Sequence, residues 1–256
     1  MALETLREEV YEANLELVRR GLVLYTFGNA SGISRADGLV AIKPSGVPYE
    51  QLTPADLTVT DMDGRIVEGK LRPSSDLATH LALYRAMPAI GGVVHTHSRY
   101  ATAWAQARRE IPCFGTTHAD YFRGAVPVTE PMSDAEIEGN YEWNTGLAIM
   151  RRFAGLDLAE ASAVLVAGHG PFCWGGSAAE AAHCAVILEE IAHTAWVTLS
   201  IAPAASPLGA AQRDHVPAVA ATIYMPVGGR RGHAEFDNPT DINAPPPPLW
   251  DGESAL

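Results

Sequence analysis

Residues 90–108 read IGGVVHTHSRYATAWAQAR, and this stretch decides the fold class. Ile90 to Val94 form a short apolar run, which is typical of a buried β-strand. The alanine-rich residues from Arg99 to Arg108 predict a helix. A strand that leads directly into a helix indicates an α/β protein, and two histidines, His95 and His97, stand between the two elements.

Three histidines follow the ends of two predicted strands. Side chains at positions i and i+2 of a strand project from the same face, so His95 and His97 would present two imidazoles to one point. His169 follows a second apolar run, Ala163 to Ala167, and the glycines on either side of it leave room for a ligand. One His-x-His pair is common by chance, but three such histidines suit zinc or another borderline divalent cation.

Further helices and strands extend outward from this stretch. Leu3 to Val18 carry apolar residues at helical spacing, and Ala178 to Ser200 form the longest helical segment. Short apolar runs separated by turn residues between Thr26 and Gly46 predict strands and tight turns. Asp63-Gly64 is a two-residue turn between two further apolar runs, which predicts a β-hairpin. These elements indicate a mixed sheet with helices packed on its faces.

The composition limits the domain count and the partners. The 256 residues and a hydrophobic fraction of 47% suffice for a single core, so we expect one domain. The formal charge of −12 would repel nucleic acid and an anionic membrane surface, so neither is an expected partner. No uninterrupted apolar run reaches the roughly 18 residues of a membrane span, and the acidic amino terminus does not fit a signal peptide. The three cysteines match no disulfide framework, which favours the reducing cytoplasm and buried thiols.

A second group of residues could bind an anion such as phosphate. Lys43-Pro44-Ser45-Gly46, Gly28-Asn29 and Ser74-Ser75 combine a cation, hydroxyls, an amide and the start of a predicted helix. Taken singly, each of these motifs is more often an ordinary turn. Asp76 is either a carboxylate metal ligand that offsets the charge of the cation or the cap of the helix from Leu77 to Met87.

Asp120 lies in a polar segment, His118-Ala119-Asp120-Tyr121, that is predicted to be a loop. A carboxyl group near a metal could donate or accept a proton, and the alternative is a structural hydrogen bond to neighbouring hydroxyls. The histidines at positions 80, 183 and 193 fall on predicted helices and are expected to serve packing or to lie on the surface.

Taken in order, seven motifs resemble the class II aldolase and adducin family, and within it the pentulose-phosphate 4-epimerases, over roughly residues 4–203. The motifs are GNASG (28–32), KPSGV (43–47), RPSSD (72–76), GGVVHTHSRYATAWAQA (91–107), TTHADYF (116–122), DAEIEGNYEWNTG (134–146) and GHGPFCWG (168–175). The resemblance implies a central, mainly antiparallel sheet with helices on both faces. It also implies a cyclic homotetramer with active sites between subunits.

The resemblance also assigns roles. It implies metal ligands for zinc, or alternatively manganese, at Asp76, His95, His97 and His169. It implies substrate and phosphate binding at Gly28, Asn29, Lys43, Ser45, Gly46, Ser74 and Ser75. Asp120 would be one catalytic acid/base, and Tyr224 would be the second, although the spacing of Tyr224 and of a matching His215 departs from the family pattern. We expect residues 1–203 to form the catalytic domain, residues 204–236 to complete the site, and the proline-rich residues 237–256 to be a flexible tail.

The activity that the resemblance implies is epimerisation of L-ribulose 5-phosphate to D-xylulose 5-phosphate through cleavage of the bond between carbons 3 and 4. A fuculose or rhamnulose phosphate aldolase of the same family is the nearest alternative, and those aldolases tend to carry glutamate where this chain has Asp76. A dehydratase acting on a thiosugar phosphate would use the same histidines. A non-catalytic module like the adducin head is the alternative from another class, and the three retained histidines count against it.

Overall fold

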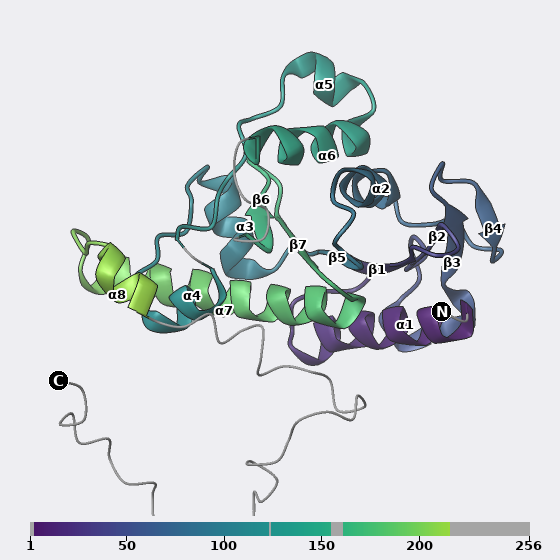
Figure 1. The fold of residues 1–256 in the computed structure, drawn as a ribbon, viewed down its shortest axis with the longest axis horizontal. Coiled ribbons are helices and arrows are strands. Elements are labelled where there is room, and N and C mark those ends of the chain that lie inside the picture. Colours follow the sequence, from purple (N-terminus) through teal and green to yellow (C-terminus); the bar gives the residue numbers. More distant parts are fainter. Residues whose placement is uncertain (1–2, 123, 155–160, 216–256) are drawn as a thin grey trace, which may run out of the picture. The chain divides into compact units, whose positions relative to one another are not determined.

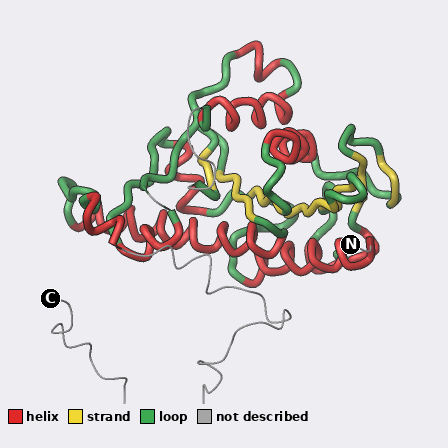
Figure 2. Tube along the Cα trace, viewed as in Figure 1, coloured by secondary structure: helices red, strands yellow, loops and turns green. Residues whose placement is uncertain are grey.

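The computed structural model describes residues 3–122, 124–154 and 161–215, and an antiparallel sheet lies at their centre (Figures 1 and 2). Among these residues, seven strands lie in the spatial order β4-β3-β2-β1-β5-β7-β6, and each neighbouring pair is antiparallel. The strands are β1 (Asn29–Ser34), β2 (Leu39–Ile42), β3 (Thr58–Asp61), β4 (Ile66–Glu68), β5 (Gly92–His95), β6 (Ala163–Leu165) and β7 (Pro171–Gly175).

Helices cover both faces of the sheet, as expected. Helices α1 (Leu3–Arg19) and α7 (Ala178–Ile201) lie on one face, and α2 (Leu77–Ala86) and α6 (Tyr141–Arg152) lie on the other (Figure 1). The remaining helices are α3 (Arg99–Gln106), α4 (Thr116–Tyr121), α5 (Asp134–Glu138) and α8 (Ala210–His215), with 3-10 turns at Tyr49–Gln51 and Pro54–Asp56. The described residues all belong to one compact unit, Met1–Ile223, while the proposed boundaries at 203 and 236 stay predictions.

The sheet separates two apolar clusters because successive strand side chains point to opposite faces. Val94 packs in the cluster that contains α1 and α7, whereas Val93 beside it packs in the cluster that contains α2 and α6. Asn14 of α1 is fully buried and fixes this helix to the central strand. Its Nδ2 donates to the Ala30 carbonyl at 3.1 Å, and its Oδ1 accepts from the Ala30 amide at 2.9 Å.

The predicted hairpin is confirmed as β3 and β4, and Gly64 in its turn has a φ of +80°, which glycine adopts without strain. The predicted loop at residues 118–121 is wrong, because these residues belong to the short helix α4. Strand β7 and helices α5 and α6 were not predicted from the sequence pattern. Strand β7 is nearly all buried and therefore shows no alternation of polar and apolar residues.

Helix α7 is the one described helix that is long and apolar enough to cross a membrane, judged by length and composition alone. Core helices of soluble proteins pass the same test. In the structure, Leu188, Ile191 and Ala192 of this helix are buried against the rest of the core. All three cysteines are free and buried, as expected.

His80 of α2 is fully buried and belongs to a polar network in the core. Its Nδ1 lies 2.7 Å from Ser31 Oγ, which in turn lies 2.8 Å from the hydroxyl of Tyr84. Burial lowers the pKa of His80 to about 3, against a smaller raising effect of Asp76. The imidazole is therefore neutral in the folded protein, and His80 has the packing role expected for it.

This burial makes stability depend on pH. Below pH 6.5 the unfolded state protonates His80 and the folded state does not, so stability falls as the pH drops from 6.5 toward 3. Between pH 7.5 and pH 5 the loss is about 2 kcal/mol. Urea unfolding of metal-free protein at pH 7.5 and pH 5 measures this loss as a difference in the free energy of unfolding. His80→Gln should reduce that difference by about 2 kcal/mol. An equal pH dependence in the variant and the parent would contradict this assignment.

Candidate metal and anion site

The pairing of three central strands brings the start of β1, the end of β5 and the start of β7 to the same end of the sheet. Asn29 of β1 pairs with His95 of β5, and His95 pairs with Phe172 of β7. The chain that leaves β5 carries His97, and the turn that precedes β7 carries His169. Residues far apart in the sequence therefore meet because antiparallel neighbours begin and end together.

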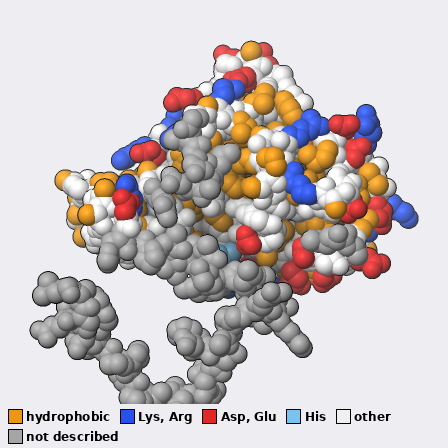
Figure 3. Space-filling model, viewed as in Figure 1, with side chains coloured by type: hydrophobic (Ala, Val, Ile, Leu, Met, Phe, Trp, Pro, Cys, Tyr) orange, Lys and Arg blue, Asp and Glu red, His pale blue; other side chains and the backbone are white. Residues whose placement is uncertain are grey.

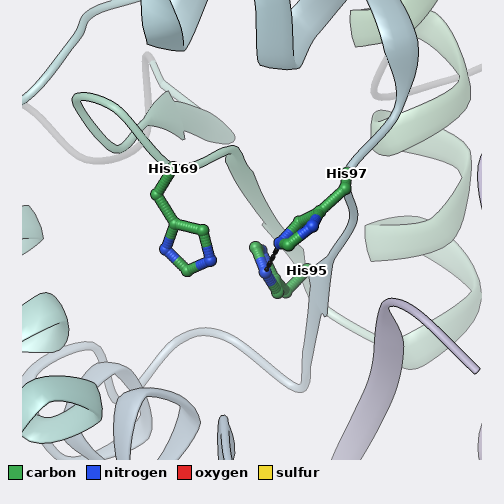
Figure 4. A group of neighbouring side chains, drawn as sticks. All are labelled: His95, His97 and His169. Atoms are coloured by element: carbon green, nitrogen blue, oxygen red, sulfur yellow. Dashed lines mark hydrogen bonds between the residues drawn. The ribbon is translucent and has the colours of Figure 1, made fainter.

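The three histidines converge, as Figure 4 shows. One possible ligand atom from each lies within 4.8 Å of the others, and Nε2 of His95 lies 3.0 Å from Nε2 of His97. The i and i+2 strand geometry that was expected to align these two imidazoles does not apply to His97, since β5 ends at His95. The two imidazoles approach each other although only His95 belongs to the strand.

The donor set fits a divalent cation. His95 Nδ1 lies 2.9 Å from the carbonyl oxygen of Pro171, and donation to this oxygen leaves the lone pair on Nε2, which faces His97. Burial and the neighbouring His95 lower the pKa of His97. Burial, His95 and His97 lower the pKa of His169 to about 4. The imidazoles of His97 and His169 are therefore neutral near pH 7, and the neutral form is the one that binds metal.

Asp76 lies beside this cluster but does not cap its helix through its side chain. Its Oδ2 instead accepts a hydrogen bond of 2.7 Å from Asn29 Nδ2. Burial acts to raise the pKa of Asp76, but His95, His80 and this hydrogen bond outweigh burial and hold the pKa below its usual value. Asp76 is therefore a carboxylate ready to offset positive charge, and its direct binding to a metal stays a prediction.

A cavity of about 370 Å³ joins the histidines to the predicted phosphate-binding residues. Its lining comprises Thr26, Phe27, Gly28, Asn29, Lys43, Pro44, Ser45, Gly46, Ser74, Ser75, Asp76, His95, His97, Tyr141, Glu142 and His169. The structure thus brings together every predicted metal ligand and every predicted substrate-binding residue. Backbone hydrogen bonds join the two segments: the Ser45 amide donates to the carbonyl oxygen of Arg72, and the Ser74 amide donates to the carbonyl oxygen of Lys43.

Lys43 gives the cavity a positive charge on a chain that is otherwise acidic. Acidic side chains gather along α1 on the face drawn in Figure 3. Lys43 is 1% exposed, and its Nζ donates to the carbonyl oxygen of Val47 at 2.8 Å. Burial lowers the pKa of Lys43 to about 8, so the amine is still mostly protonated at pH 7. A buried ammonium bonded to a carbonyl oxygen suits an anionic ligand such as phosphate.

Five lining residues had no predicted role: Thr26, Phe27, Pro44, Tyr141 and Glu142. The hydroxyl of Tyr141 lies 3.5 Å from Nδ1 of His169, close enough to help orient that imidazole. The motif that contains Tyr141 and Glu142 is part of the resemblance, and this was the signal that could have identified them.

Of the two predicted acid/base residues, the structure describes only Asp120, and it does not line this cavity. Asp120 lies on α4 and is absent from the described lining of the cavity. His215 is the last residue of α8, and Tyr224 lies outside the described residues. Within the described part of one chain, the site thus has its cation and anion ends but not Asp120.

The chain is similar to a known family model and to known proteins. Residues 8–196 match the model of the class II aldolase and adducin N-terminal domain. The chain is 52% identical over 206 residues to L-ribulose-5-phosphate 4-epimerase UlaF of Salmonella paratyphi B, which covers 80% of this chain and 90% of that protein. The protein of the same name from Salmonella typhi is 51% identical with the same coverage.

Solved structures show the same fold. An L-fuculose 1-phosphate aldolase superposes with a TM-score of 0.70 at 25% identity, covering 83% of this chain and 94% of that one. The L-fuculose-1-phosphate aldolase of Thermus thermophilus gives 0.62 at 27% identity, with coverages of 79% and 98%.

The three histidines should act together in metal binding. We expect His97→Ala to weaken zinc binding by about 100-fold or more, because it removes one of three converging donors. Competition with a chromogenic chelator measures the dissociation constant. His193→Ala, which alters a histidine of α7 outside the cluster, is the matched control and should bind zinc like the parent. Unchanged affinity in His97→Ala would show that the cluster is not the metal site.

Proposed function

The chain belongs to the class II aldolase and adducin family, and we propose that it interconverts L-ribulose 5-phosphate and D-xylulose 5-phosphate as a metal-dependent 4-epimerase. The observation that carries this proposal is one cavity in which three imidazoles stand beside a buried ammonium and three serines. Such a cavity fits a substrate that carries a ketone at one end and a phosphate at the other. The 52% identity to a Salmonella L-ribulose-5-phosphate 4-epimerase favours L-ribulose 5-phosphate over other sugar phosphates as the substrate.

Different residues of the cavity bind the phosphate and the cation in this proposal. Lys43, Ser45 and Ser74 bind the phosphate, and the imidazoles of His95, His97 and His169 hold the cation. A divalent cation there, zinc in our proposal, supplies the positive charge that stabilises an enediolate. Asp76 offsets that charge, and its hydrogen bond from Asn29 keeps the carboxylate in place.

The reaction balances without a further reagent. A base removes the proton of the hydroxyl on carbon 4, the bond between carbons 3 and 4 breaks, and its electron pair passes to the enediolate of dihydroxyacetone. The other fragment is glycolaldehyde phosphate. When this aldehyde presents its opposite face, the bond forms again, and an acid on that side protonates the new alkoxide. Cleavage and re-addition thus invert carbon 4.

Two acid/base groups are required, one on each face, and we propose Asp120 for one and Tyr224 for the other. Because Asp120 is not in the cavity of its own chain, we propose that it acts in the cavity of a neighbouring subunit of a cyclic homotetramer. This arrangement, a cytoplasmic location and a role in pentose catabolism such as that of L-arabinose complete the proposal.

The activity can be tested by a proton NMR time course of L-ribulose 5-phosphate with zinc- or manganese-loaded protein. We expect D-xylulose 5-phosphate to accumulate to equilibrium without free glycolaldehyde phosphate. Accumulation of the free aldehyde would indicate an aldolase instead. Absence of any reaction with both metals would refute the proposed activity.

Subunit sharing of the site can be tested by complementation. Asp120→Asn should cut turnover by about 100- to 10,000-fold, because it removes one proton-transfer group, with metal content unchanged. His97→Ala should be inactive through loss of metal. When the two variants are unfolded together and refolded at equal amounts, about a quarter of the sites should regain both intact residues. No recovery in verified mixed oligomers would place Asp120 and His97 in the same subunit's site or outside catalysis.

A further inference from the structure

Tyr49 touches two sides of the anion-binding end of the cavity without lining the cavity itself. It begins the 3-10 turn that follows KPSGV, and only 4% of its surface is exposed. The pKa of its hydroxyl is raised by burial, so the group is neutral and serves as a hydrogen-bond donor. Its position between two segments that are separate in the sequence gives it a role beyond packing.

The ring of Tyr49 holds the ammonium group of Lys43. Nζ of Lys43 lies 4.6 Å from the centre of the ring, within the range of a cation–π interaction. The ammonium also donates to backbone carbonyl oxygens, at 2.8 Å to Val47 and at 3.4 Å to Pro44. The aromatic face therefore replaces part of the water that a buried ammonium loses, and it stabilises the charged form in one place.

The hydroxyl of Tyr49 donates a hydrogen bond to the Phe27–Gly28 segment, which also lines the cavity. It lies 3.0 Å from the carbonyl oxygen of Gly28 and 3.2 Å from that of Phe27, so one proton is shared between two acceptors. Gly28 has a φ of +72°, and a Cβ there would lie 2.9 Å from the carbonyl oxygen of His95. The loop is therefore confined between Tyr49 and the strand that carries the first metal-binding histidine.

We propose that Tyr49 is a positioning residue for the substrate phosphate, which fixes Lys43 through its ring and the Phe27–Gly28 loop through its hydroxyl. This inference rests on the proposed function only in taking the anion to be the phosphate of the substrate. Loss of the ring frees the ammonium of Lys43, and loss of the hydroxyl frees the loop that precedes Asn29. The two contributions can be separated by substitution.

The experiment uses zinc-loaded protein and inorganic phosphate as the probe. The rise of the melting temperature with phosphate concentration gives its dissociation constant. Tyr49→Phe keeps the ring and should weaken phosphate binding about 3- to 5-fold. Tyr49→Leu loses both interactions and should weaken it about 10- to 30-fold. The zinc affinity of both variants should stay within about twofold of the parent, since the histidines are not contacted.

Tyr84 provides a matched control. It is also buried, its hydroxyl bonds to Ser31 Oγ at 2.8 Å, and Arg35 lies 5.4 Å from the centre of its ring. Tyr84→Phe and Tyr84→Leu should bind phosphate like the parent even where they lower the melting temperature. If both Tyr49 variants bind phosphate like the Tyr84 variants, Tyr49 has no positioning role.

A kinetic readout separates positioning from general loss of structure. In the epimerase assay, the Tyr49 variants should raise KM by factors similar to those for phosphate, with kcat changed less than about threefold. A fall in kcat with unchanged KM would overturn the inference. If the parent binds phosphate in a Tyr49-dependent way but epimerises nothing, the proposed activity fails and the positioning role stands.

Discussion

The register of three antiparallel strands is the constraint on which the site depends. Asn29, His95 and Phe172 lie side by side in β1, β5 and β7. A shift of any of these strands by one residue would turn its side chains to the other face of the sheet. The two apolar clusters prevent such a shift, because Val93 and Val94 would exchange their partners on opposite faces. Core packing therefore fixes the positions of the polar groups at this end of the sheet.

The electrostatics of the site follow from its position at this end of the sheet. An acidic chain would repel a phosphate, so the attraction has to come from groups placed next to the ligand. Lys43 is buried with a carbonyl acceptor, and His97 and His169 are neutral because burial penalises their charged forms. The Asp76 carboxylate lies beside the imidazoles and adds a negative charge. One cavity is therefore lined by the buried ammonium of Lys43, by three imidazoles and by this carboxylate.

The helices on the second face extend the site beyond the sheet. Helix α2 begins directly after Asp76, and α6 begins with Tyr141 and Glu142, which complete the lining. The two helices pack on each other, so the carboxylate at the start of one and the tyrosine at the start of the other are held over the histidines. This arrangement leaves Asp120 on α4, outside the cavity of its own chain.

Local periodicity, turn residues and motif order in the sequence were enough to predict the helices α1, α2, α3 and α7, the hairpin at Asp63-Gly64, and the histidines and polar residues that the structure brings into one cavity. They did not reveal β7, whose residues are buried on both faces, or the helical form of α4. Three features became visible only in the folded chain: Asp76 accepts a hydrogen bond from Asn29 instead of capping its helix, His97 lies beyond the end of β5, and the Tyr49 hydroxyl donates to Phe27 and Gly28. These contacts join residues more than twenty positions apart or depend on how the chain turns after a strand, and such features follow from packing of the whole chain, not from local preference.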